Sequence, residues 1–345
     1  MRSRVIGGEF ELCSIPEGRF HQRIHNNYAC GRAALYKILQ SINPAPVKVW
    51  LPDWLCESMI DAARKAGVNY DFYRLGPDYR LDVQQFLDNH NPVGGQEVIL
   101  LVNYFGLTDV ETTISELKSQ EVDAVIIEDD VQALFSFLDN GEHSADYRFT
   151  SLRKTIASPD GGLVKTRKRI SPPQKENSFA PLKLKGALTK GKADERTDDL
   201  EYLSLFEQGE ALIDDNYESG MSGEGWKIYT STDFDFVAKR RRANAQFLIK
   251  ELSVCGIEPL MPIMPDDVPL FVPIKIGRRD EVRKALRQHN IFCPVHWPLR
   301  DDMMILQMGL EMAEKELSLV IDQRYTEEDM MCIVEVIKDA LWKLS

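Results

Sequence analysis

Two residues that can do chemistry stand 25 positions apart near the middle of the chain. Asp129 follows the short apolar run 124–127, and Lys154 follows a second strand-like run, 147–152. A lysine amine forms a Schiff base with the aldehyde of pyridoxal phosphate, and a carboxylate opposite the ring nitrogen keeps that nitrogen protonated. The pair therefore suits this cofactor. The alternative is ordinary, because acidic clusters at strand ends are common and a lone lysine is usually solvated.

The segments around these two residues indicate how they are positioned. The run 124–127 is continuously apolar, which is typical of a strand buried on both faces of a parallel sheet. In open α/β sheets the ligand lies beyond the carboxyl ends of the strands. We therefore expect Asp129 and Gln132 to face a ligand crevice, with Ser151 arriving from the next strand. Gly161–Gly162 allows a tight turn before a strand at 163–164.

Strand-like and helix-like segments alternate through the first third of the chain. Such βα repetition predicts a mostly parallel sheet with helices on both faces, which is the α/β class. The expected strands are 47–51, 68–73, 98–102 and 122–127, and the expected helices are 57–66, 81–89 and 110–118.

The length indicates two unequal domains, because 345 residues exceed one average domain. We expect a large domain over residues 1–235, including an N-terminal arm with a short strand at 10–12, and a small C-terminal α+β domain over 236–345. Helices are expected over about 196–216 and from Phe234. The small domain should contain strands at 270–276, 291–295 and 317–321, and helices at 280–289, 302–314 and 327–344.

Composition excludes several classes of partner. The formal net charge of −12 disfavours binding to nucleic acid or to an anionic membrane. The six cysteines are scattered, without a C-x-x-C pair, so we expect reduced thiols, no metal site and a cytoplasmic location. No stretch is long and apolar enough to predict a membrane span, and the first residues do not read as a secretion signal.

A basic segment provides the cations that an anionic substrate would need. Residues 165–200 read as the longest irregular stretch of the chain, and they contain Lys183, Lys185, Lys190 and Lys192. Long irregular loops tend to be functional or mobile. The alternative is a solvated run of charge, which is the more common situation.

Two further features have a functional and a structural interpretation. Gly31 opens a helix, and a helix N-terminus presents free N–H groups that suit a phosphate. The same residues also describe an ordinary helix start. Trp54 follows a predicted strand, where its ring can lie against an aromatic ligand or simply pack in the core.

Taken together and in order, these motifs resemble the DegT/DnrJ/EryC1/StrS family of sugar aminotransferases, which are fold type I pyridoxal phosphate enzymes. The resemblance extends over nearly the full length. Its pieces are Gly31–Leu35, Leu51–Trp54, Tyr104–Gly106, Ile127–Leu134, Ser151–Lys154, Asp160–Gly162, Arg241–Asn244 and Pro294–Trp297.

The resemblance implies a role for each matching residue. Lys154 would carry the Schiff base and shuttle protons, and Asp129 would pair with the ring nitrogen. Gln132 would bind the ring's phenolic oxygen, and Trp54 would stack on the ring. The phosphate would be held by Gly31, Arg32 and Ser151, and His296 would meet the substrate. Lys183 and Lys185 are expected to meet the substrate because of their charge, since the segment 171–195 has no clear counterpart in the family.

The resemblance also implies an activity and an assembly. Glutamate would donate an amino group to a keto sugar linked to a nucleotide, in an active site closed by the second chain of a homodimer. Cys30-Gly31-Arg32 departs from the family's usual Ser-Gly-Thr. Two alternatives stay open: another reaction of a fold type I enzyme, and a catalytically silent relative that acts as a scaffold or regulator.

Overall fold

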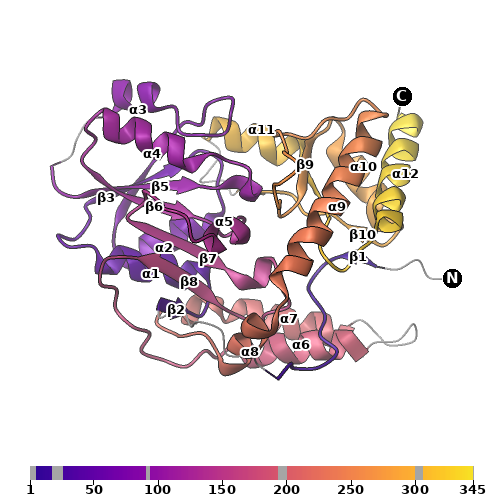
Figure 1. The fold of residues 1–345 in the computed structure, drawn as a ribbon, viewed down its shortest axis with the longest axis horizontal. Helices are drawn as coiled ribbons and strands as arrows, with labels where there is room; N and C mark the ends of the chain where they lie inside the picture. Colours follow the sequence, from indigo (N-terminus) through magenta and orange to yellow (C-terminus); the bar gives the residue numbers. More distant parts are fainter. Residues whose placement is uncertain (1–4, 18–25, 91–93, 193–199, 300–305, 345) are drawn as a thin grey trace.

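The computed structural model describes residues 5–17, 26–90, 94–192, 200–299 and 306–344. Its centre is a sheet of seven strands in the order β2-β8-β7-β6-β5-β3-β4 (Figure 1). The strands are β2 (Asn26–Tyr28), β3 (Lys48–Pro52), β4 (Asn69–Tyr73), β5 (Glu97–Val102), β6 (Ala124–Asp129), β7 (Tyr147–Ser151) and β8 (Gly162–Thr166). Strands β3 to β7 pair in parallel, and only β8 and β2 add antiparallel pairs. The predicted mostly parallel sheet is confirmed.

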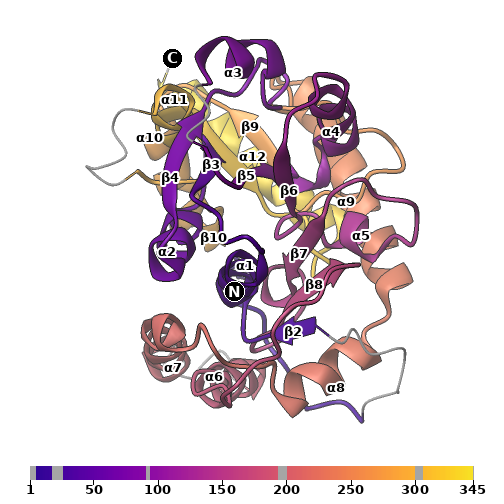
Figure 2. The same cartoon turned by 90° about the vertical axis from the view of Figure 1, so that its left-hand side faces the viewer.

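Helices cover both faces of this sheet, as the βα alternation predicts (Figure 2). The helices are α1 (Gly31–Ser41) and α2 (Glu57–Ala66) on one face, and α3 (Val83–Asn89) and α4 (Val110–Ser119) on the other. Side chains along β3 alternate between the two cores: Val49 and Leu51 pack with α1 and α2, whereas Trp50 packs with α3 and α4. Burial on both sides explains why these strands read as continuous apolar runs.

Capping residues fix the ends of several helices close to the boundaries predicted from the sequence. Asp82 and Asp109 accept hydrogen bonds from the N–H groups of Gln85 and Thr112, so each caps the first turn of its helix. Helix α2 ends at Gly67, which adopts the left-handed conformation with φ of 73°.

The C-terminal part forms a second core beside the sheet. Its elements are α9 (Phe234–Ser253), β9 (Val272–Lys275), α10 (Arg279–Gln288), β10 (Ile291–Phe292), α11 (Gln307–Lys315), β11 (Glu316–Leu319) and α12 (Glu327–Leu344). Buried side chains from 245 to 340 make this core, and Ile6 of β1 (Ile6–Gly7) joins it. Strand β1 pairs in parallel with β10, so the N-terminal arm is attached to the C-terminal part (Figure 1). The division between residues 235 and 236 stays a prediction.

Three secondary-structure predictions need correction or restriction. Residues 10–12 form no strand; instead, the N–H of Leu12 donates to the carbonyl of Ala187 at 3.0 Å. The stretch 165–200 is not irregular throughout, because α6 (Ala180–Lys192) lies within it. The first residues of the predicted helix 302–314 lie outside the described part, and α11 begins at Gln307.

The remaining helices are short or lie at the edge of the sheet. They are α5 (Leu134–Leu138), α7 (Leu200–Ala211) and α8 (Gly223–Ser231). Of these, only α7 corresponds to a helix predicted from the sequence. Helices α6 and α7 pack against each other beside α8, at the end of the sheet where β2 lies (Figure 2). Among the described residues, no helix combines the length and the apolar character that crossing a membrane requires.

Candidate functional site

A cavity of about 150 Å³ lies at the carboxyl ends of β5, β6 and β7, against the first turn of α1. This is the edge at which parallel sheets bind ligands. Seven of the residues predicted from the sequence line it: Gly31, Arg32, Asp129, Gln132, Ser151, Lys154 and His296. Trp54, Lys183 and Lys185 are not among its lining residues.

Asp129 is the last residue of β6, and its side chain is almost completely buried. Its Oδ1 accepts a hydrogen bond from the N–H of Val131 at 2.8 Å. Burial raises the pKa of the Asp129 carboxyl to about 7. No basic side chain of the described residues forms an ion pair with Asp129. A ligand with a protonated nitrogen would supply the missing charge.

The raised pKa predicts a pH-dependent stability in the cofactor-free chain. The folded chain binds more protons at Asp129 than the unfolded chain between about pH 4 and pH 7, so this group's contribution to stability falls as pH rises through that window. Asp129→Asn removes the effect and keeps the acceptor for Val131. We expect the cofactor-free variant to be more stable than wild type at pH 8, by at most about 4 kcal/mol, and to lose that advantage at pH 4. Urea unfolding at the two pH values measures this, and an advantage independent of pH would contradict it.

Lys154 ends the 3₁₀ helix η2 (Leu152–Lys154) directly after β7. Its ammonium forms no hydrogen bond or ion pair with a described residue, and the side chain is accessible through the cavity. The packed surroundings lower the pKa of Lys154, first by desolvation and then by the neighbouring Arg153 cation. A lysine is a nucleophile only after its ammonium loses a proton, so this environment favours a reactive amine.

The first turn of α1 faces the same cavity without a side-chain cap. Cys30 occupies the cap position and makes no capping hydrogen bond, so the helix start retains backbone N–H groups for a ligand. Gly31 packs closely behind β7: a Cβ there would lie 3.0 Å from Val131 Cγ2 and 3.3 Å from Ser151 Cβ. The geometry suits an oxyanion even though the sequence lacks the usual hydroxyl residues here.

The two arginines beside this turn already have acidic partners. Arg32 pairs with Asp214, and Arg153 Nη1 lies 2.8 Å from Glu210 Oε2. Both Arg32 and Glu210 line the cavity. An incoming phosphate must therefore share the two arginines with these carboxylates or displace the carboxylates from them.

The predicted substrate lysines have other surroundings. Lys183 is buried in α6 and lies 2.5 Å from Glu210 Oε2, while Lys190 lies 3.1 Å from Glu11 of the N-terminal arm. Lys185 and Lys192 are exposed. Contact between these lysines and a substrate stays a prediction, since α6 contributes no residue to the cavity lining; Glu210, the partner of Lys183, lines the cavity from α7.

Trp54 is fully buried and packs within the protein. Its ring stacks on Tyr104 with centroids 4.6 Å apart, and its Nε1 donates to the carbonyl of His296 at 2.9 Å. The aromatic rings that line the cavity belong to Phe149 and Trp297. Stacking of Trp54 on a cofactor stays a prediction and would require the cavity to open toward this ring.

His296 belongs to a polar group that sequence reasoning found only in part. Its Nδ1 lies 2.8 Å from Ser318 Oγ, and Glu316 accepts the N–H of His296 at 2.6 Å and the hydroxyl of Ser318 at 2.5 Å. Burial, followed by the Lys154 charge, lowers the pKa of His296 to about 3, so the ring is neutral at pH 7. Glu316 and Ser318 alternate on β11, where no local motif distinguishes them from core residues.

Three possible metal ligands meet outside the cavity. Glu111, Glu128 and His143 have ligand atoms within 4.8 Å of one another. Arg148 Nε lies 2.9 Å from Glu128 Oε2 and already neutralises that carboxylate. The competing guanidinium disfavours a cation here, and the absence of a metal stays a prediction.

Comparison with known proteins finds similarity in structure alone. No family model and no curated protein matches the chain. The solved sugar aminotransferase CalS13 from Micromonospora echinospora is 18% identical, with a TM-score of 0.63 over 91% of this chain and 86% of that one. A DegT DnrJ EryC1 StrS aminotransferase from Brucella abortus is 18% identical, with a TM-score of 0.60 over 91% and 85%.

A third similar structure is Spr1654 from Streptococcus pneumoniae in its PLP form. It is 15% identical, with a TM-score of 0.66 over 93% of this chain and 87% of that one. Likeness at these identities concerns the arrangement of helices and strands. The chain therefore has the fold of the fold type I pyridoxal phosphate transferases.

Proposed function

We propose that this chain is a pyridoxal phosphate-dependent aminotransferase. It moves an amino group, with glutamate as donor, to a keto sugar linked to a nucleotide. The observation that carries the proposal is the meeting of Asp129, Lys154 and the uncapped start of α1 on one cavity, in a fold shared with a protein solved in a PLP form. The sugar and the nucleotide come from the resemblance to the DegT/DnrJ/EryC1/StrS family.

The residues of the cavity fit this cofactor. Asp129 is a buried carboxylate without a cationic partner, which a protonated ring nitrogen would complete. The start of α1, with Ser151 and Arg32, would hold the phosphate. When bound, the cofactor supplies an aldehyde that exchanges amino groups and a ring that accepts electrons.

Each remaining step belongs to the chain's own residues. Lys154 Nζ takes a proton from the substrate carbon and returns it, because its lowered pKa makes the neutral amine available. Asp129 would pair with the ring nitrogen of the bound cofactor and keep it protonated. Gln132 Oε1 accepts the N–H of Phe105 at 3.1 Å, which leaves its amide nitrogen as the group that would donate to the phenolic oxygen of the cofactor.

A loss of rate in Asp129→Asn tests the electronic role of this carboxylate. The amide cannot keep the ring nitrogen protonated, so turnover should fall by roughly 10²-fold or more while the cofactor still binds. Steady-state turnover and the visible spectrum of the same preparation measure both quantities. Unchanged turnover in a cofactor-saturated variant would show that Asp129 has no such role.

A catalytically silent relative is the second candidate, and one observation favours it. The arginines nearest to the expected phosphate position, Arg32 and Arg153, are paired with Asp214 and Glu210. The positive charge available to a phosphate there is therefore partly neutralised. The visible spectrum of the purified protein with added cofactor separates the two candidates. Absorbance near that of free cofactor only, with no amine transfer from glutamate, would support the silent candidate. Product analysis then distinguishes amino transfer from another reaction of this fold type.

We also propose a cytoplasmic homodimer. The six cysteines are free, which suits a reducing compartment, and the family resemblance implies that a second chain closes the cavity. The dimer should bury about 2,000 Å² or more, as obligate dimers do. Analytical ultracentrifugation at micromolar concentration measures the mass, and a fully active monomer would overturn this part of the proposal.

A further inference from the structure

A second and larger cavity, of about 410 Å³, lies on the other side of Lys154. Residues of the N-terminal arm, of η2 and of the C-terminal part line it. Arg153, Lys154 and Leu270 line both this cavity and the one at Asp129. An occupant of the second cavity would therefore reach the amine of Lys154.

Six basic side chains line this second cavity, although the chain as a whole carries a net charge of −12. They are Arg153, Lys154, Arg241, Arg283, Arg287 and Arg324, and the only carboxylates in the lining are those of Glu9 and Asp322. Such a concentration of positive charge raises the local concentration of anions.

Acidic partners neutralise only some of these cations. Arg324 lies 2.8 Å from Asp322 and 2.9 Å from Glu11, and Arg153 is paired with Glu210. Arg283 and Arg287 have no such ion pair among the described residues. Their charge is therefore available to a ligand.

Arg283 is held in place by the protein and still has free donors. Its Nε donates to the carbonyl of Cys293 at 3.1 Å, which fixes the guanidinium plane. The terminal nitrogens make no hydrogen bond to a described residue. Arg287 follows one turn later on α10. Burial and the cations of Arg287 and Arg279 lower the pKa of Arg283, as expected where like charges gather.

We propose that this cavity binds an oxyanion of a substrate through Arg283 and Arg287, while the substrate's reacting end faces Lys154. Arginine binds carboxylates and phosphates in a planar, two-point geometry. Two substrates of the proposed function carry such a group: the carboxylates of the amino donor and the diphosphate of the nucleotide-linked sugar. The assignment of the anion to a substrate rests on that proposed function, whereas binding of the anion does not.

Calorimetric titration of the purified protein with glutarate and with inorganic pyrophosphate tests the site. Wild type should bind one of the probes, and the double variant Arg283→Gln/Arg287→Gln should bind it at least 10-fold more weakly. Lys284→Gln is the matched control, because Lys284 is an exposed cation of the same helix that does not line the cavity. Selective loss of glutarate binding assigns the cavity to the amino donor, and selective loss of pyrophosphate binding assigns it to the nucleotide-linked substrate.

Two results would overturn the inference: binding of neither probe, or equal binding by wild type and the double variant. The titration needs no cofactor, so it separates this inference from the proposed function. If the double variant loses probe binding and wild type does not bind pyridoxal phosphate, the anion site is supported and the proposed function is refuted. If wild type binds pyridoxal phosphate and the double variant binds the probe as wild type does, the anion site is refuted and the proposed function stands.

Discussion

Lys154→Ala is expected to abolish amine transfer. The variant loses both the nucleophile and the group that moves the proton, so turnover should fall by at least about 10⁴-fold. The cofactor should still bind, because the start of α1 and the buried Asp129 are unchanged. Its spectrum should be that of the unattached aldehyde. Turnover with glutamate and the visible absorbance of the loaded variant provide the two readouts.

Borohydride reduction followed by peptide mapping makes this assignment specific. Wild type saturated with cofactor should carry its pyridoxyl label on Lys154 and nowhere else. Lys338→Ala is the matched control, since Lys338 is an exposed lysine of α12 outside the cavity, and its loss should change neither labelling nor turnover. A label on a different lysine, or an unlabelled wild type at saturation, would refute the role of Lys154.

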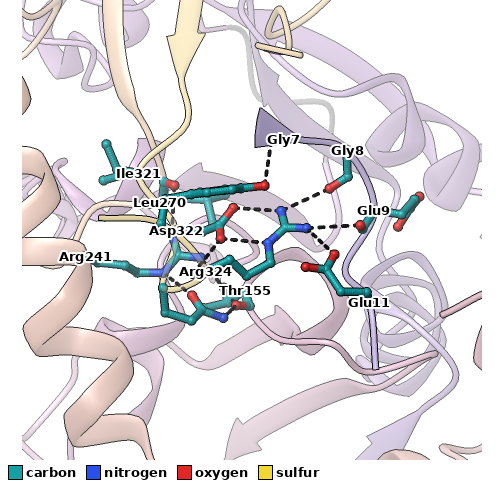
Figure 3. A network of polar contacts seen from close by, with 12 residues as sticks. Gly7, Gly8, Glu9, Glu11, Thr155, Arg241, Leu270, Ile321, Asp322 and Arg324 are labelled. Atoms are coloured by element: carbon teal, nitrogen blue, oxygen red, sulfur yellow. Dashed lines mark hydrogen bonds and ion pairs between the residues drawn. The ribbon is translucent and has the colours of Figure 1, made fainter. Parts of the chain in front are cut away.

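Arg241→Met is expected to destabilise the fold strongly. Arg241 is 1% exposed, and it donates to the carbonyls of Leu270 at 2.9 Å and Thr155 at 3.3 Å (Figure 3). Its Nε also donates to Gln323 Oε1 at 3.1 Å. Methionine fills part of the space but removes the donor of the buried Leu270 carbonyl and one of the two donors of the Thr155 carbonyl. We expect a loss of roughly 3–5 kcal/mol in the free energy of unfolding.

The same substitution should disturb the position of Lys154, because Thr155 is its neighbour in the chain. The carbonyl of Thr155 also accepts from Gln323 Nε2 at 2.9 Å. Arg242→Met is the control: this half-buried arginine donates to the carbonyl of Asp266, and its loss should cost less than about 1 kcal/mol. Urea unfolding measures both variants. Equal stability of the two would mean that the buried network contributes little.

Much of the sheet could be predicted because local and long-range preferences agree there. The apolar run before Asp129 is buried on both faces, and Gly67 terminates α2 in the conformation that its sequence predicts. Residues 180–192 were predicted wrongly for the opposite reason. Their glycines and scattered lysines give little helical periodicity, and contacts with α7 stabilise the helix instead.

The site was predicted unevenly, for a similar reason. Asp129, Gln132 and Lys154 follow strand ends, where the chain itself marks the edge of the sheet. Arg283, Glu316 and Ser318 come from the C-terminal part. Arg283 lines the second cavity with Lys154, and Glu316 and Ser318 contact His296, which lines the cavity at Asp129. The position of Trp54 after a strand does not determine the direction of its side chain. Its ring is buried in the core and stacks on Tyr104.

The pairing of β1 with β10 has a consequence for synthesis on the ribosome. Ile6 has no strand partner until Ile291 has been made, which at about 5–20 residues per second takes roughly 15–60 seconds. During that interval the seven-stranded sheet can form before β1 has its partner, with Ile6 still in contact with solvent. The enclosure around Lys154 is completed only after translation of the C-terminal part, because Gly7 donates to the hydroxyl of Tyr325. A ligand that needs the arm can therefore bind only after the C-terminal part, including Tyr325, has been made.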